Sequence, residues 1–90
     1  MHVTTSELGH QIRLVLNEGG TLPVDATTLK DGDDLYAAGL TSHATVNLML
    51  GLEERFDVEF PDRLLRRRTF ESIDAISAAV TELLASKKAA

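Results

Sequence analysis

Ser42 is the residue of this chain whose type and position best suit covalent chemistry. It stands where an acidic segment ends and an apolar helical pattern begins, so it could cap a helix and still face water. A serine hydroxyl is a poor nucleophile unless a base activates it. His43 is adjacent in the sequence, but neighbouring residues of a helix do not face each other. We therefore predict that Ser42 is a handle for covalent attachment, and that the chain has no catalytic site of its own.

No other group of residues has the spacing of a metal or nucleotide site. The three histidines, His2, His10 and His43, include no pair at zinc-ligand spacing with a third ligand nearby. The acidic run 31–34 lacks the alternation of a calcium loop and its closing glutamate. The glycine pair 19–20 is too short to cradle a nucleotide. We expect neither a metal site nor a nucleotide site.

Ser42 depends on a helix that must begin near that position. Helical spacing of apolar residues predicts a helix over about Ser42–Phe56. Leu48 is expected either to widen the buried side of this helix or to face a partner. The buried side itself is expected to consist mainly of Val46, Met49, Leu50, Leu52 and Phe56.

A first helix and a long connection are predicted before it. The first helix is expected to start after Thr4, which forms a capping box with Glu7, and to stop at the glycine pair 19–20. Its apolar stripe consists of Leu8, Ile12, Val15 and Leu16. The connection 21–41 is unusually long for a compact domain. The apolar residues expected to fasten it across the bundle are Leu22, Val24, Leu29, Leu35 and Leu40.

The carboxyl-terminal third predicts a short turn and a last helix. Pro61 breaks the chain, and Asp62 offers an N-cap for a turn through residues 64–65. Thr69 is expected to cap the last helix, with Glu71 in its first turn, where the dipole favours an anion. The stripe of this helix is Ile73, Ile76, Val80, Leu83 and Leu84, and the basic residues at its negative end are Lys87 and Lys88.

These elements predict an all-α domain that spans residues 1–90, with a core from about 5 to 86. We expect a four-helix bundle with one short third helix and a long first loop, because no strand signal of comparable quality is present. The chain contains no cysteine, which excludes disulfides and thiolate metal ligands. Stability must therefore come from buried Leu, Ile, Val and Phe side chains, each worth about 1.5–3 kcal/mol.

The composition indicates a protein partner rather than nucleic acid or a membrane. The chain has 14 acidic and 9 basic residues, and nine carboxylates lie between positions 25 and 62 against only Lys30 and Arg55. Such a surface steers a protein toward basic partners, although the acidity could serve solubility alone. Few aromatic residues and an acidic balance argue against nucleic acid. No stretch approaches the roughly 20 apolar residues of a membrane span, and the first six residues lack signal-peptide features, so we expect a cytoplasmic protein.

Three motifs in the correct order give the chain a family resemblance. They are Gly39-Leu40-Thr41-Ser42, Leu52-Glu53-Glu54-Arg55-Phe56 and Phe60-Pro61-Asp62. Together with the leucine-rich helix, they resemble the acyl carrier proteins over about residues 35–76, and the predicted bundle is of the acyl-carrier type. The resemblance implies that Ser42 carries a 4'-phosphopantetheine arm, attached by a phosphopantetheinyl transferase that uses coenzyme A. The thiol of that arm would hold an acyl or aminoacyl group as a thioester.

The chain departs from the fatty-acid carriers around this serine. The family usually has Asp before it and Leu after it, where this chain has Thr41 and His43. Fatty-acid carriers also place carboxylates on the first turns of this helix, but the segment 43–47 has none. This uncharged start resembles the free-standing aminoacyl carrier proteins. Their implied partner is a ligase resembling class II aminoacyl-tRNA synthetases, which would activate a small amino acid with ATP. A polyketide or fatty-acid type acyl carrier is the alternative.

The arginine-rich run 63–68 is a further departure, because fatty-acid carriers tend to be acidic there. It can be a solvated basic turn that balances the acidity, or a docking patch for an acidic partner. Alternatively, the chain is a helical adaptor that is never loaded; Glu53, Glu54 and the arginines then form its interface, and Ser42 only caps the helix. In either case we expect a monomer with transient complexes. The residues expected to contact partners are Thr41, His43, Val46, Asn47, Arg63, Arg66 and Arg67.

Overall fold

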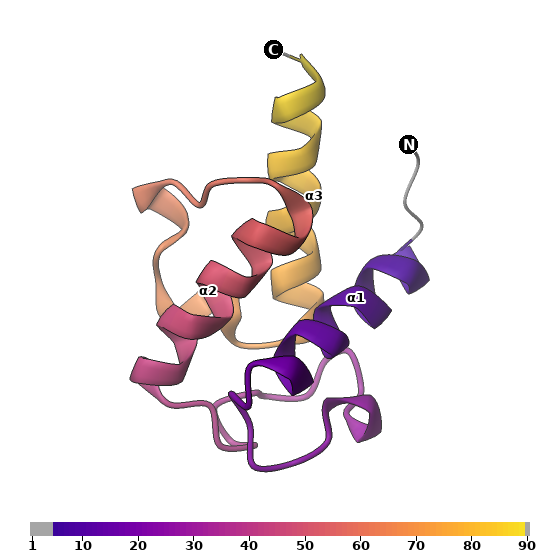
Figure 1. The fold of residues 1–90 in the computed structure, drawn as a ribbon, viewed down its shortest axis with the longest axis vertical. Helices are drawn as coiled ribbons and strands as arrows, with labels where there is room; N and C mark the ends of the chain where they lie inside the picture. The colour runs from indigo at the N-terminus through magenta and orange to yellow at the C-terminus, as the bar shows by residue number, and fades with distance from the viewer. Residues whose placement is uncertain (1–4, 90) are drawn as a thin grey trace.

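Within the described residues, the fold consists of three α-helices and three short 3₁₀ turns joined by loops (Figure 1). This computed structural model describes residues 5–89, and the side chains of residues 6–87. The elements are α1 (Thr5–Glu18), η1 (Ala26–Thr28), α2 (Ser42–Phe56), η2 (Asp62–Leu64), η3 (Arg67–Phe70) and α3 (Ile73–Ala89). Residues 5–89 contain no strand, and none of their helices has the length and apolar composition of a membrane span. The all-α class predicted from the sequence is confirmed.

The predicted short third helix is replaced by two separate 3₁₀ turns. In η2 the Leu65 N–H donates to the Asp62 carbonyl, and in η3 the Thr69 N–H donates to the Arg66 carbonyl. Such i→i+3 bonds rarely extend beyond three or four residues. The four-helix count is therefore not confirmed, since residues 5–89 contain three α-helices. The predicted N-cap at Asp62 is wrong, because Asp62 already belongs to η2 and Pro61, which precedes it, has no side chain able to cap.

α1 forms as its apolar spacing predicts. The helix ends at Glu18, directly before the glycine pair 19–20. Every residue of the predicted stripe is buried: Leu8, Ile12, Val15 and Leu16. The predicted capping residue, Thr4, lies outside the described residues, so the capping box stays a prediction.

The long loop 19–41 is fastened to the helices at several points and closes one end of the molecule, at the bottom of Figure 1. The Leu35 N–H donates to the Glu71 carbonyl over 2.8 Å, and the Asp74 N–H donates to the Asp31 carbonyl over 3.0 Å. Arg13 of α1 also pairs with the Asp31 carboxylate at 2.7 Å. Four of the apolar residues predicted to fasten the loop are buried or partly buried: Leu22, Leu29, Leu35 and Leu40. The fifth, Val24, is exposed.

Gly39 sets the path of the backbone into α2. Its φ of +117° lies in a region that residues with a Cβ rarely adopt. A Cβ at this position would lie only 2.6 Å from Cγ and Cδ of Pro23, so the two segments can approach this closely only at a glycine. The next residue, Leu40, is buried, and its N–H donates to the Leu35 carbonyl over 3.0 Å. The chain is therefore fixed immediately before α2 begins.

α2 has the predicted bounds, but its buried side differs from the prediction. Leu48 is fully buried, whereas Val46 and Leu50, expected in the core, are each 52% exposed. Apolar residues surround much of this helix, so spacing alone does not decide which side turns inward. In the structure α2 turns the side that contains Gly51 toward α1, where a Cβ on Gly51 would lie 2.9 Å from Cγ1 of a valine. The remaining predicted residues do pack against the core: Met49, Leu52 and Phe56.

α3 begins later than predicted, because Ser72 rather than Thr69 caps it. The Ala75 N–H donates to Ser72 Oγ over 3.0 Å, while Thr69 is buried within η3. A hydroxyl that packs inside a turn is not free to cap the helix that follows. The predicted stripe is confirmed, with four residues buried and one partly buried: Ile73, Ile76, Val80, Leu83 and Leu84.

Lys87 ties the far end of α3 to the end of α2. Its Nζ donates to the Asp57 carbonyl over 2.8 Å and to Asp57 Oδ2 over 2.6 Å. The hydrogen bond from Lys87, followed by its charge, lowers the pKa of Asp57 below its ordinary value of 3.8. Lys87 and Lys88 lie in the last turn of α3, as predicted. The side chain of Lys87, however, contacts Asp57 at the end of α2.

Leu48 and Leu50 offer a matched test of the side that α2 buries. Leu48→Ala removes a fully buried side chain, and we expect the free energy of unfolding to fall by about 2–5 kcal/mol. Leu50→Ala removes a half-exposed side chain, and we expect a change within about 0.5 kcal/mol. Urea unfolding followed by circular dichroism measures both. Equal losses of unfolding free energy in the two variants would contradict the burial of Leu48 and the exposure of Leu50.

Candidate functional site

The hydrogen bond that caps the amino end of α2 is accepted by Thr41 rather than by Ser42. Thr41 has extended backbone angles, φ −92° and ψ 165°, and its Oγ1 accepts from the Ala44 N–H over 3.0 Å. The N–H and the hydroxyl of Thr45 both donate to the Thr41 carbonyl, over 2.9 and 2.8 Å. Thr41 is therefore the N-cap. The expectation that Ser42 caps the helix is wrong.

Ser42 is the first residue of α2, and its hydroxyl is available for chemistry. The residue is exposed, and no side chain or backbone group among the described residues bonds its Oγ. The N–H groups of Ser42 and His43 have no acceptor within the helix, as is usual for a first turn. A free hydroxyl and two unpaired amides thus lie together at the amino end of α2.

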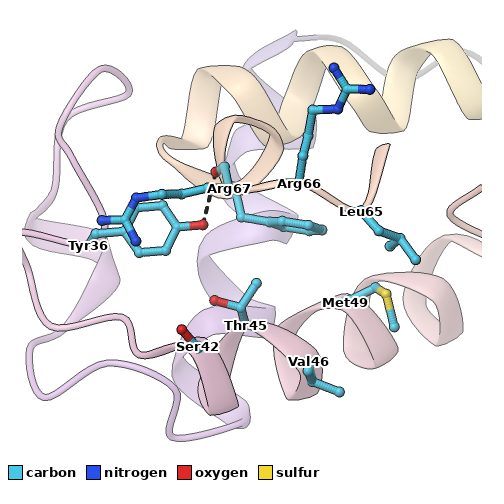
Figure 2. Close-up of a pocket in the computed structure, with 9 residues that line it drawn as sticks. Tyr36, Ser42, Thr45, Val46, Met49, Leu65, Arg66 and Arg67 are labelled. Carbon is cyan, nitrogen blue, oxygen red and sulfur yellow. Dashed lines mark hydrogen bonds between the residues drawn. The ribbon is translucent and has the colours of Figure 1, made fainter. Parts of the chain in front are cut away.

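Ser42 lies at one end of an open groove with a volume of about 330 Å³ (Figure 2). One wall is formed by α2 residues at helical spacing i, i+3, i+4 and i+7: Ser42, Thr45, Val46 and Met49. The other wall comes from the loop before α2 and from the η2–η3 segment: Tyr36, Leu65, Arg66, Arg67 and Phe70. Figure 2 shows Ser42 at the end near Tyr36, with Met49 and Leu65 at the other end. The groove therefore runs along α2, away from the serine.

Tyr36 and Arg67 form a fixed corner at the Ser42 end of the groove. The Tyr36 hydroxyl donates to the Arg67 carbonyl over 2.9 Å. The guanidinium of Arg67 lies over the Tyr36 ring, 3.8 Å from its centre. The Tyr36 N–H donates to Asp34 Oδ1 over 2.9 Å, so the tyrosine is held from both ends.

The arginine-rich run 63–68 does not form one continuous patch. Arg63 donates to both carboxylate oxygens of Glu82 in α3, over 3.1 Å each. Arg66 lines the groove, but its side chain points away from Ser42 in Figure 2. Arg68 borders a separate hollow beside α3. Only Arg66 and Arg67 of the four arginines belong to the groove.

The other residues predicted to contact partners lie at the start of α2 and along its first two turns. Thr41, His43 and Asn47 are exposed, but they do not line the groove, whereas Val46 does. Of the acidic residues in the alternative adaptor interface, Glu53 has an internal role, because its Oε2 accepts from the N–H of a core phenylalanine over 2.8 Å.

Five groove residues had no predicted role in a site: Tyr36, Thr45, Met49, Leu65 and Phe70. Thr45 and Met49 follow Ser42 at helical spacing, so this pattern could have identified them. Tyr36 and the η2–η3 residues come from other segments. No local pattern in the sequence brings them near Ser42.

The groove offers a nucleophile without a base. Its lining residues include neither a carboxylate nor a histidine. The described side chains also include no group of three that could hold a metal ion. No residue that lines the groove is therefore suited to remove the proton of Ser42.

Comparison with known proteins identifies the family. The phosphopantetheine attachment site family matches residues 19–80, from directly after α1 into α3. The aminoacyl carrier protein of Agrobacterium fabrum (strain C58) is 54% identical over 79 residues, which cover 88% of this chain and 95% of that protein. The chain belongs to the aminoacyl carrier proteins. Phosphopantetheine is thus the cofactor of its family, as the resemblance to the acyl carrier proteins implied.

Solved structures of similar carriers contain a ligase. The crystal structure of an engineered Bradyrhizobium japonicum glycine:[carrier protein] ligase, complexed with the carrier protein from Agrobacterium tumefaciens and ATP, contains a chain 52% identical to this aminoacyl carrier protein. The two superpose with a TM-score of 0.79 over 83% of this chain and 97% of that chain. A chain in the crystal structure of the Bradyrhizobium japonicum glycine:[carrier protein] ligase with glycylated carrier protein is 29% identical to this chain. The two superpose with a TM-score of 0.69 over 80% of this chain and 96% of that chain.

Substitutions at Thr41 and at Ser42 should change the stability of the protein by different amounts. Thr41→Ala removes the N-cap hydrogen bond, so we expect the free energy of unfolding to fall by about 1 kcal/mol, while Thr41→Ser retains it. Ser42→Ala removes no hydrogen bond, and we expect a change within about 0.5 kcal/mol. Urea unfolding measures all three variants. A loss at Ser42→Ala as large as that at Thr41→Ala would show that the serine is the cap.

Proposed function

We propose that Ser42 carries the 4'-phosphopantetheine arm of the family, attached through Oγ as a phosphodiester. The free, exposed hydroxyl on the first residue of α2 is the observation that supports this most strongly. Ser42 also opens onto the groove, whose volume of about 330 Å³ leaves room for an arm beside the helix. The residues present therefore fit the group.

The part of this chain in loading is to present the serine. The unpaired N–H groups of Ser42 and His43 can donate to an incoming phosphate, and the helix dipole favours negative charge at the same end. Thr41 keeps the first turn closed, so these groups need no rearrangement. Because the groove has no base, we infer that a separate phosphopantetheinyl transferase activates Ser42 and supplies the arm from coenzyme A. The attached arm provides the thiol that this cysteine-free chain lacks.

We propose that the cargo is an amino acid held as a thioester, with glycine as the first candidate. Similar carriers occur in complexes with a glycine:[carrier protein] ligase, and one of those carriers is glycylated. The loading partner of this chain would be a ligase of that kind, resembling class II aminoacyl-tRNA synthetases, that activates the amino acid with ATP. The chain itself would contribute no catalytic group.

We propose that partners dock on the uncharged outer side of α2. Val46 and Leu50 are each 52% exposed, and Leu65 across the groove is 46% exposed. An apolar centre with a polar rim is typical of protein interfaces. The rim would consist of Thr41, His43, Asn47, Arg63, Arg66 and Arg67. We expect a monomer that forms transient complexes and acts in the cytoplasm, where coenzyme A and ATP are supplied.

Intact-mass spectrometry tests the attachment site. After incubation with coenzyme A and a transferase of broad specificity, wild type should gain the mass of one arm and Ser42→Ala should gain none. Ser86→Ala is the matched control, because Ser86 is also an exposed serine on a helix, and it should load like wild type. Loading of Ser42→Ala would contradict the proposal. A wild type that stays unmodified across several transferases would favour the unloaded adaptor.

The loaded wild type then tests the cargo. With ATP, glycine and a glycine:[carrier protein] ligase, it should form a thioester that hydroxylamine releases, and the chain without its arm should form none. Ready loading of fatty or malonyl groups, together with no thioester from any amino acid, would contradict the aminoacyl assignment and favour the acyl carriers.

A further inference from the structure

Arg67 is a fixed cation that has no carboxylate partner in the described part of the chain. Four other basic residues form ion pairs there: Arg13, Arg55, Arg63 and Lys87. Arg67 instead stacks on Tyr36, with its guanidinium carbon 3.8 Å from the ring centre. Stacking uses the face of the guanidinium and leaves the N–H groups along its edge free to donate.

Tyr36 is itself held in place, so the stacked guanidinium is positioned before any anion arrives. The Tyr36 hydroxyl donates to the Arg67 carbonyl, and the Tyr36 N–H donates to Asp34 Oδ1, over 2.9 Å each. The neighbouring Leu35 N–H is bonded to the Glu71 carbonyl at the end of η3. The loop before α2 and the η3 turn are therefore joined at this corner. A donor that is fixed in advance loses less conformational entropy on binding.

Tyr36, Arg67 and Ser42 lie at the same end of the groove (Figure 2). We propose that Arg67, stacked on Tyr36, binds the phosphodiester of the arm within the same molecule; this rests on attachment of the arm at Ser42. The phosphate would lie between the amino-terminal N–H groups of α2 and the edge of the Arg67 guanidinium. A phosphate tethered to Ser42 stays near Arg67 at high effective concentration. Guanidinium–phosphate hydrogen bonds are charge-assisted and often bidentate.

The other unpaired arginines of the run do not have this placement. Arg66 points away from Ser42, and Arg68 borders a hollow on another side, together with Glu82. Of these three arginines, only Arg67 both lies at the Ser42 end of the groove and has its guanidinium stacked on an aromatic ring. A phosphate bound there would fix the root of the arm on the groove side of α2. The rest of the arm would then start along the groove rather than away from the protein.

NMR of the chain with and without its arm tests this proposal in the absence of any ligase. In isotope-labelled wild type, attachment should shift the Arg67 Nε–H signal and slow its exchange with water by about two- to threefold, the size expected for one exposed ion pair. Salt at about 1 M should abolish the effect. The phosphorus signal of the loaded chain should move in Arg67→Gln and stay unchanged in Arg68→Gln. Both arginines are exposed, so both variants should fold.

A phosphorus signal that is identical in wild type and Arg67→Gln, with an unchanged Arg67 Nε–H signal, would overturn the proposal. The comparison starts from a chain whose mass shows one arm on Ser42, so this result would leave the attachment proposal standing. Tyr36→Leu tests the stacking, because it keeps the charge of Arg67 and removes the ring. We expect a smaller slowing of exchange in this variant, and an undiminished effect would contradict the role of Tyr36.

Discussion

The free hydroxyl of Ser42 depends on one hydrogen bond, which runs from the Ala44 N–H to Thr41 Oγ1 over 3.0 Å and closes the first turn of α2. Because Thr41 supplies this cap, Ser42 has no structural bond to lose. A covalent group can be placed on Ser42 without removing a contact that holds the helix. The acyl carrier resemblance places an aspartate where this chain has Thr41. Threonine and aspartate are both favoured N-caps, so the substitution keeps the cap and removes a charge beside the serine.

The loop before α2 determines where this cap can form. It is hydrogen-bonded to the end of η3 through Leu35 and to the start of α3 through Asp31. It also passes against Pro23 at Gly39, where only a glycine fits. The same loop carries Tyr36 to the η3 turn, where it contacts Arg67. The support of the helix and the far wall of the groove are therefore parts of one unit. A disturbance of the loop should affect both the presentation of the serine and the corner beside it.

Much of the fold could be predicted from the sequence, because the large apolar residues of α1 and of α3 each form a single stripe. The side of α2 that faces inward could not be predicted, because α2 has apolar residues on most sides. In the structure Val46 and Leu50 lie on the exposed side. At the site, Ser42 could be predicted because its motif is local in the sequence. The corner of Tyr36 and Arg67 joins residues 31 positions apart. Such a contact depends on the tertiary path of the loop, which no spacing pattern encodes.

The most direct test of this account is the rate at which a phosphopantetheinyl transferase modifies two glycine variants. Gly39→Ala places a Cβ 2.6 Å from Pro23 and should displace the segment that leads into Ser42. Gly32→Ala is the matched control, because nothing lies within 4 Å of a Cβ there. With both variants folded by circular dichroism, we predict that kcat/KM falls by about tenfold or more for Gly39→Ala and is unchanged for Gly32→Ala. Loading of Gly39→Ala at the wild-type rate would contradict the claim that the loop presents the serine.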